Sequence, residues 1–305
     1  MDKIGKDLLK KVADLHEIPE GAYNIRENGG LGGRRTTANI DIITKEEKPG
    51  IDIIIKPNTK NESVHIPVII SKSGLDDLVY NDFYIGENAD VVVIAGCGIH
   101  NTGDDKSSHD GIHTFHVGKN AKIKYVERHY GAGDGLGTNV MNPTTVIEID
   151  DGGYMEMETT QIKGIDSTIR KTSAKLGNDA KLVIKESLMT HGNQYAKTDF
   201  TVDLDGENSS ANVISRSVAK DESYQEFLSI INGNNKCAGH TECDAIIMGK
   251  ARVCAIPQIT ANHLDASLIH EAAIGKIAGE QLMKLMTLGL TEEEAEEQIV
   301  NGFLK

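Results

Sequence analysis

A nine-residue pattern recurs through the middle of the chain about every thirty residues. The clearest copies are IGENADVVV (85–93), VGKNAKIKY (117–125) and LGNDAKLVI (176–184), with weaker copies at 149–157 and 207–215. Each copy turns at Gly, Asn or Asp and then enters a strand with alternating apolar residues. The copies are 32, 32, 27 and 31 residues apart when they are aligned on Ala89, Ala121, Gly153, Ala180 and Ala211.

A repeat of this length indicates a solenoid, a propeller or another array. The alternating apolar positions exclude a helical repeat, and a four-stranded propeller blade needs about 40–45 residues. A coil of about thirty residues fits a parallel β-helix, in which inward-facing apolar residues are buried only when the coils stack. The sequence therefore predicts a mainly β protein with its β-helix core at 76–268, a helical and mixed region at 1–75 and a helical region at 269–305.

Helical patterns stand at both ends of this predicted core. Residues 2–15 place five apolar side chains on one helix face, namely Ile4, Leu8, Leu9, Val12 and Leu15. Near the C-terminus one helix is expected to end at about Leu288, before Gly289. A capping box that starts at Thr291 opens a second helix, which is expected to run to about Phe303. Such a tail serves either as a cap for the β-helix or as a docking site for another protein.

The charge balance narrows the function. The chain has 46 acidic and 32 basic residues and a net charge of −14, which argues against binding to nucleic acid or to an anionic membrane. No apolar run reaches the length of a membrane span, and the first residues lack the apolar core of a signal peptide. We therefore expect a cytoplasmic protein.

Three of the four cysteines lie within CAGHTECDAIIMGKARVC (237–254). In a reducing compartment such a cluster indicates metal binding or catalysis rather than a disulfide. Cys243 and His270 are 27 residues apart, so a coil of that length would place them on neighbouring strands. Cys254 is then about half a coil away, either across the solenoid or round a corner of the coil. Packing of the cysteines in the core is an equally good interpretation at this point.

A histidine run and two glycine-rich stretches offer weaker signals. The run comprises His100, His109, His113, His116 and His129, with Cys97 nearby. Alternate histidines on a strand can bind a transition metal, but hydrogen-bonded ladders on a half-exposed sheet are the favoured interpretation. The stretches at 28–37 and 131–139 do not match a phosphate-binding loop and are expected to be loops.

Residues 210–303 closely resemble the C-terminal half of the SufB/SufD family, the scaffold subunits of the Suf iron–sulfur cluster assembly machinery. The resemblance extends more thinly from about residue 80. The matching motifs are Cys243-Asp244 in a strand of small residues, the Pro257 turn, His270-Glu271, and the ending GLTEEEA…IVNGF. The chain lacks the N-terminal cysteine motif of bacterial SufB. It is therefore most similar to the compact, SmsB-like SufB form of archaea and anaerobes.

This resemblance implies a right-handed parallel β-helix whose C-terminal helices dock a SufC-like ABC ATPase. It also implies that two solenoids pair and that a cluster is assembled where they meet. Cys243 matches the sulfur-accepting cysteine of the family, and His270 and Glu271 match its candidate histidine and carboxylate ligands. Cys237 and Cys254 have no firm counterpart in the bacterial pattern.

The leading hypothesis is a non-catalytic scaffold that receives iron and sulfur at Cys243, Cys254, His270, Glu271 and Cys237. It would hold a transient iron–sulfur cluster, expected to be 4Fe-4S, as a homodimer or beside a SufB/SufD-like paralogue. An ABC ATPase and a sulfur donor would be its other partners. The alternative is a cytoplasmic β-helix protein that acts on or binds polysaccharide, although the chain has no Trp for a sugar cleft.

Overall fold

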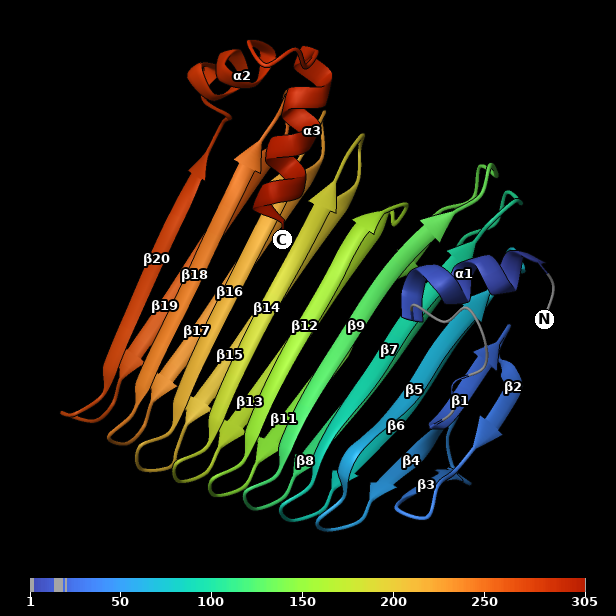
Figure 1. Cartoon of the computed structure of the whole chain (residues 1–305), viewed down its shortest axis with the longest axis vertical. Helices are drawn as coiled ribbons and strands as arrows, with labels where there is room; N and C mark the ends of the chain where they lie inside the picture. The colour runs from blue at the N-terminus through green and yellow to red at the C-terminus, as the bar shows by residue number, and fades with distance from the viewer. Residues whose placement is uncertain (1–2, 14–18, 20, 305) are drawn as a thin grey trace.

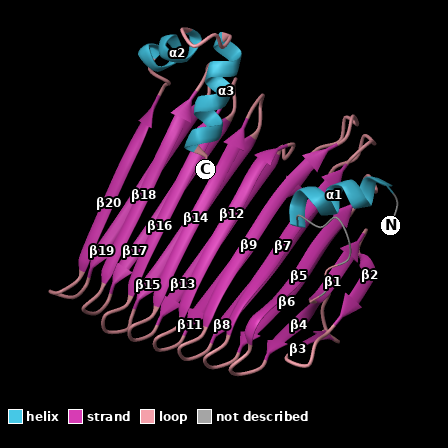
Figure 2. Cartoon of the chain, in the orientation of Figure 1, coloured by secondary structure: helices cyan, strands magenta, loops and turns pink. Residues whose placement is uncertain are grey.

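The computed structural model describes residues 3–13, 19 and 21–304, and it is a parallel β-solenoid built from two facing sheets (Figures 1 and 2). The first sheet contains, in spatial order, β2 (Gly30–Arg35), β1 (Ala22–Glu27), β5 (Lys60–Ile70), β7 (Asp90–His100), β9 (Lys122–Ala132), β12 (Tyr154–Lys163), β14 (Lys181–Thr190), β16 (Ser210–Ala219), β18 (Ala238–Ile247) and β20 (Ser267–Gly275). The predicted parallel β-helix is confirmed.

The second sheet runs in the spatial order β19 (Arg252–Ala261), β17 (Tyr224–Gly233), β15 (Tyr195–Leu204), β13 (Ser167–Leu176), β10 (Asn139–Met141), β8 (Ser107–Val117), β6 (Asp76–Ile85), β4 (Gly50–Ile55) and β3 (Ile40–Thr44). The short strand β11 (Thr144–Ile149) follows β10 and also pairs with β8 and β13. From β5 onward the strands alternate between the sheets, with β10 and β11 together occupying one place in the second sheet, so each coil contributes to both sheets.

The Asn or Asp of the repeated pattern occupies a left-handed turn in successive coils. The backbone φ is positive at Asn88, Asn120, Asp179 and Asn208, and Gly152 takes the same role in its coil. Asn, Asp and Gly tolerate this conformation better than other residues. The amide of each of these residues also donates to a carbonyl of the next coil, as Asn88 does to Lys119 at 2.9 Å. The repeat is thus a ladder of equivalent turns.

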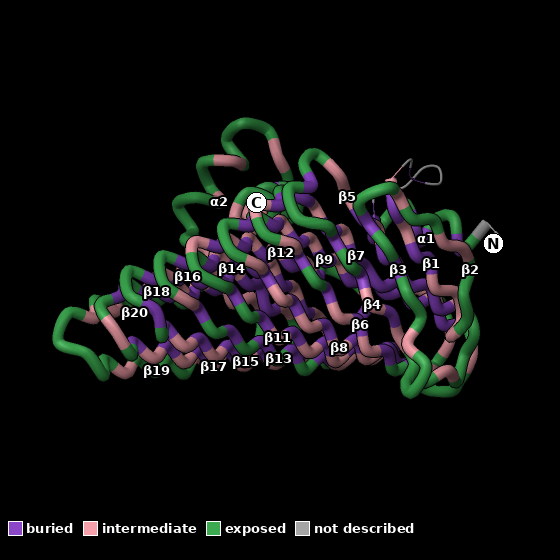
Figure 3. The backbone as a smooth tube through the Cα atoms, turned by 90° about the horizontal axis from the view of Figure 1, so that it is seen from below, coloured by how far each residue is buried: buried purple, intermediate pink, exposed green. Residues whose placement is uncertain are grey.

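The core lies between the sheets, where strand residues alternate between buried and partly exposed (Figure 3). Inward-facing apolar side chains stack from coil to coil. Phe83 and Phe115 stack with ring centroids 4.3 Å apart, and Phe200 meets Phe227 edge-on at 6.0 Å. This stacking explains why a single coil would have no core of its own.

Coil length changes along the solenoid. Lys122 pairs with Tyr154, a step of 32 residues, whereas Tyr154 pairs with Lys181, a step of 27. The next step is 29 residues and not the predicted 31, because Leu182 pairs with Ala211. The residue in register with Ala180 is therefore the buried Ser209. The alignment on Ala211 was wrong by two residues because period-two alternation looks the same after a shift of two.

The N-terminal end of the solenoid is closed by antiparallel strands and a helix. β2 pairs antiparallel with β1, and β3 pairs antiparallel with β4. Helix α1 (Lys3–Ala13) packs on the outer face of β5 and β7 through Leu8, Leu9 and Val12. Ile4 is 37% exposed, and Leu15 lies outside the described residues.

The segment predicted as 1–75 already contains the first parallel pairs, because β1 runs parallel to β5 and β4 to β6. At the other end β20 continues to Gly275, beyond residue 268. The glycine-rich stretch at 28–37 contains a strand, β2, and is not only a loop. In that hairpin Arg34 donates to Asn24, and Arg35 to the carbonyl of Gly21.

Two helices follow the last coil. α2 (Gly279–Met286) has no buried residue, whereas α3 (Glu292–Phe303) buries Ala295 and Val300. The predicted capping box is present: Thr291 Oγ1 accepts from the Glu294 amide and Glu294 Oε2 accepts from the Thr291 amide. The end of α3 lies over the first sheet, where Ser187 Oγ of β14 donates to the Leu304 carbonyl at 2.9 Å (Figure 1).

One ion-paired group lies inside the solenoid. Arg170 of β13 donates to Glu127 of β9 at 2.5 Å, and its Nε lies 3.7 Å from Glu186 of β14. All three side chains are at most 5% exposed. Burial alone would raise the pKa of Glu127, but Arg170 and His129 hold it well below its ordinary value. The carboxylate is therefore charged at neutral pH and contributes stability that is lost as the pH falls through that lowered pKa.

Replacing Arg170 should destabilise the protein strongly. Arg170→Met keeps much of the side-chain length but leaves two carboxylates buried without their cation, a loss of about 3–5 kcal/mol in the free energy of unfolding. The control is Lys185→Met, which removes an exposed ion pair with Glu156 and should cost about 1 kcal/mol or less. Urea unfolding followed by circular dichroism at pH 7 measures both. Equal losses in the two variants would contradict the assigned role of Arg170.

Candidate functional site

Strand β18 carries the cysteine-containing motif between β16 and the last strand of the sheet, β20. Its residues alternate: Thr241, Cys243 and Ala245 are buried inside the solenoid, whereas His240 and Glu242 lie on the outer face. The wall of the solenoid therefore separates two groups of side chains that are adjacent in sequence.

The inner group centres on Cys243. This side chain is 1% exposed and stands between Ser215 of β16 and Ala272 of β20. Burial, together with the negative charges of Glu186 and Asp244, raises the pKa of the Cys243 thiol to about 12. The thiol is therefore protonated at neutral pH while it stays enclosed, and a protonated thiol is a poor nucleophile and metal ligand.

His270 lies on the same inner face, but not directly opposite Cys243. The coil is 29 residues long here, so His270 pairs with Thr241, and the predicted 27-residue register is wrong. His270 is diagonal to Cys243, two positions away along the strand. Its Nδ1 is buried, and none of the described residues forms a hydrogen bond with it. An unsatisfied buried nitrogen of this kind is a candidate for a ligand bond.

The other predicted site residues are dispersed. Cys237 is buried in the turn before β18, where its Sγ lies against Gly233. Cys254 is half-buried on β19 of the opposite sheet, in register with the outward-facing Glu226. It is therefore about half a coil from Cys243, as predicted. Glu271 points outward. Cys237 and Cys243 are buried, so the cysteines of 237–254 do not form an exposed thiol cluster.

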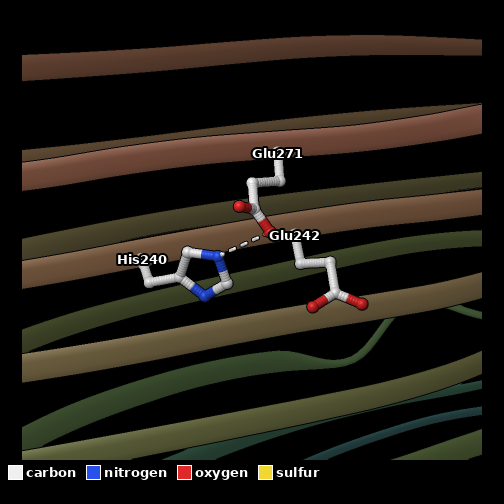
Figure 4. A group of neighbouring side chains, drawn as sticks. All are labelled: His240, Glu242 and Glu271. Atoms are coloured by element: carbon white, nitrogen blue, oxygen red, sulfur yellow. Dashed lines mark ion pairs between the residues drawn. The ribbon is translucent and has the colours of Figure 1, made fainter.

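The outer group is formed by His240, Glu242 and Glu271 (Figure 4). His240 Nε2 lies 3.4 Å from a carboxylate oxygen of Glu271, and His240 Nδ1 lies 2.9 Å from Asn212 Oδ1. Partial burial and the neighbouring Asp244 raise the pKa of Glu242. Neither His240 nor Glu242 was predicted as a ligand, although both lie in the cysteine-containing motif. The alternation of β18 together with a 29-residue coil would have identified both.

A line of polar side chains inside the solenoid was not predicted from the sequence. Ser215, which stands beside Cys243, donates to Glu186 at 2.7 Å, and Glu186 also accepts from Thr198 at 2.8 Å. Glu186 in turn faces Arg170. The signal was available in YVERHYG (125–131), where the charged Glu127 occupies an inward position, but the apolar pattern of the repeat obscured it.

The histidine run forms hydrogen bonds rather than a metal site among the described residues. His109 pairs with Asp77 at 3.1 Å, His113 with Tyr125 at 2.8 Å, and His129 with Gln161 at 3.3 Å. These three histidines are buried, so the ladder lies in the interior rather than on a half-exposed sheet. Burial lowers the pKa of His113 to about 4, which keeps this ring neutral at neutral pH. His116 lies on the outer face beside Glu148, as the alternation predicts.

The C-terminal end of the solenoid is open. β19 and β20 are the last strands of their sheets. Ile259 and Ile274 pair with the buried Ile231 and Ala245 and so belong to the inward-facing rows, yet they are 44% and 40% exposed because no further coil covers them. Cys243 and His270 thus lie within the last two strands of a sheet that ends in solvent.

None of the described helices combines the length and apolar character needed to cross a membrane.

Comparison with known proteins identifies a family. Residues 80–303 match the domain described as "SUF system FeS cluster assembly, SufBD core domain". An iron–sulfur cluster assembly SufBD family protein of Methanocaldococcus jannaschii is 32% identical over 257 residues, which are 83% of this chain and 79% of that protein. A Methanothermobacter thermautotrophicus relative of the same description is 33% identical over 72% of this chain, which spans 53% of that protein's length. A Pyrococcus horikoshii relative is 28% identical over 89% of this chain and 83% of its own.

Proposed function

Because the chain belongs to the SufBD family of SUF-system iron–sulfur cluster assembly proteins, we propose that it is a non-catalytic scaffold on which a cluster is built and then released. The family assignment supports a role in iron–sulfur cluster assembly and favours this hypothesis over a polysaccharide-binding one. The observation that carries the scaffold proposal is the placement of Cys243 and His270 on one inward face at the open end of the solenoid.

In this proposal Cys243 accepts sulfur and His270 supplies a nitrogen ligand. The raised pKa of Cys243 keeps it unreactive while the last coil stays closed. Movement of β20 away from β18 would hydrate the thiol, remove the desolvation that raises its pKa, and expose the unsatisfied Nδ1 of His270. Sulfur and iron would then enter only when the coil opens, which protects the thiol from oxidation between cycles.

One chain does not surround a cluster by itself. A 4Fe-4S cluster is usually held by four ligands, whereas Cys243 and His270 are the two candidate ligands on this inward face. Two chains meeting at their open ends would double the set around a twofold axis, the commonest symmetry of oligomers. We therefore place a transient cluster between two chains, either identical or paralogous. Cys254, on the outer face of β19, and Cys237 are candidate additional ligands, and the buried Cys237 becomes available only if the coil opens.

The proposed pairing of two chains would also cover the exposed surface of the last coil. An uncovered edge strand presents unpaired backbone groups to any complementary strand. Strands β19 and β20 and the turn between them also expose apolar side chains at this end, namely Ile256, Ile259, Leu264, Ile269 and Ile274. A second copy of the chain would satisfy both the backbone edges and the apolar surface.

The proposed ATPase partner would dock on α2. This helix buries no residue, and Met283 is 61% exposed, with Leu288 just beyond it 77% exposed. Apolar side chains at this exposure on a terminal helix are typical of a surface that another protein covers. A nucleotide-driven movement of the partner could pull on α2, which is joined to β20 by only three residues.

Replacing Cys243 should abolish cluster formation. Cys243→Ser keeps the size of the side chain but removes the soft ligand, so iron and sulfide bound after anaerobic reconstitution should fall to background. Cys97→Ser is the matched control, because it makes the same change at another buried cysteine and should load normally. Circular dichroism checks that both fold. Wild-type loading of the Cys243 variant would refute its role.

Interrupting the open end should prevent pairing of chains. Ile259→Lys places a charge in the exposed inward row of β19, so a wild-type dimer should become a monomer in multi-angle light scattering. Leu136→Lys provides the control, because Leu136 is 88% exposed in a distant loop and should leave the dimer intact. A wild-type chain that stays monomeric at high concentration, alone and with the ATPase subunit, would contradict the homodimer.

Charging α2 should release the ATPase subunit. Met283→Glu combined with Leu288→Glu introduces two carboxylates into the exposed apolar surface, and co-purification with a co-expressed SufC-like ATPase should fall by at least about tenfold, or 1.4 kcal/mol. Leu136→Glu is the matched control and should retain the partner. Full retention by the α2 variant would rule out this docking site.

A further inference from the structure

The outer face of β18 and β20 carries a second cluster of potential metal ligands that the proposed scaffold site does not use. One ligand atom from each of His240, Glu242 and Glu271 lies within 4.8 Å of the others (Figure 4). We infer that these three side chains bind a single divalent first-row transition-metal ion on the outside of the solenoid wall. The inference does not depend on the proposed function, because such a site needs neither the Cys243 thiol nor sulfide.

The hydrogen bond of His240 prepares the ring for a metal. Asn212 Oδ1 can only accept, so the His240 Nδ1 that lies 2.9 Å from it carries the proton. In the neutral ring, Nε2 then has a free lone pair. Histidine ligands in metal sites are commonly fixed in this way, with the second ring nitrogen donating to a neighbouring oxygen. Asn212 therefore acts as a positioning residue for His240.

The Nε2 lone pair faces a carboxylate oxygen of Glu271 at 3.4 Å. Two acceptors at this distance repel each other unless a proton or a cation lies between them. Ligand atoms bound at about 2.0–2.1 Å to a tetrahedral ion are about 3.3 Å apart. The observed separation therefore fits two ligand atoms of one shared ion, as it also fits a proton held between them.

The local charge also favours a cation. Glu242 and Glu271 come from paired positions on neighbouring strands, and Asp244 lies two residues from Glu242 on the same face. Across the described part of the chain, no lysine or arginine lies within ion-pairing distance of Glu242 or Glu271, and Arg216, whose charge acts on Glu242, is paired in register with Asp244. Like charges on directly opposed strand positions destabilise a sheet. A divalent ion would remove this repulsion.

The donor set identifies the class of ion. One imidazole and two carboxylates suit borderline ions such as Zn²⁺, Fe²⁺, Co²⁺ or Mn²⁺, whereas Cu⁺ prefers thiolates. The site also differs from the scaffold site in position: Glu242 precedes Cys243 in sequence, but the two side chains lie on opposite faces of the sheet. Glu271, which the family resemblance implies as a cluster ligand, belongs to this outer group in the structure.

Cobalt titration tests the site. Full-length chain stripped of metal with a chelator is titrated with Co²⁺ without sulfide, and visible d–d absorption should saturate at one Co²⁺ per chain, without thiolate-to-metal charge transfer. His240→Ala should weaken binding by at least about tenfold, and so should Asn212→Ala, because loss of such a partner typically costs about 10–100-fold. Glu271→Gln, at an exposed position, gives a second ligand variant that leaves packing unchanged.

Two controls make the result decisive. His263→Ala removes an exposed histidine in the turn before β20 and should leave Co²⁺ affinity unchanged. Cys243→Ser should also bind Co²⁺ like the wild type, although it is expected to fail in cluster reconstitution. Wild-type Co²⁺ affinity in both His240→Ala and Glu271→Gln would overturn the inference, as would a charge-transfer band that Cys243→Ser removes. Neither outcome affects the scaffold proposal, which is tested separately by iron and sulfide reconstitution of Cys243→Ser.

Discussion

Arg170 ties the two sheets together through the interior of the solenoid. It extends from β13 of the second sheet to Glu127 and Glu186, which lie on β9 and β14 of the first sheet with β12 between them. A single guanidinium thus joins three successive coils and both walls. Because each carboxylate would be costly to bury alone, the position of every strand in this group is constrained by the others. The apolar side chains stacked in the coils before and after this group can then vary without changing the register of the strands.

The same group links the middle of the molecule to the candidate site. Tyr125 donates to Glu127 on β9, and Ser215 of β16 donates to Glu186 on β14. Hydrogen-bonded polar atoms therefore lie inside the first sheet up to the position next to Cys243. The Glu186 charge contributes to the raised pKa of the Cys243 thiol. Reactivity at the end of the solenoid is therefore set partly by an ion-paired group two strands away. An interior lined only by apolar side chains would hold no charge that could change the pKa of Cys243.

The architecture was predictable because turn residues and strand alternation report directly on a stacked coil. The Asn and Asp residues of the repeat occupy left-handed turns, and the capping box of α3 follows from local rules alone. Coil length was harder, because a shift of two residues preserves the alternation, and this error displaced His270 from its true partner Thr241. Arg170 and Glu186 were not predicted to pair, since nothing in the sequence indicates which inward positions face each other across the two sheets. The outer group at His240 depended on the same register.

The antiparallel strands at the N-terminal end limit how such solenoids can polymerise. Stacked parallel coils resemble the arrangement of fibrils, in which each open end recruits another chain. Here β2, rich in glycine and ending in Arg34 and Arg35, closes one sheet, and the short β3 closes the other. Charged, short or irregular edge strands discourage further pairing. Because only one end of the solenoid has open edges, association through that end, if it occurs as proposed, would stop at two chains instead of growing into a fibre.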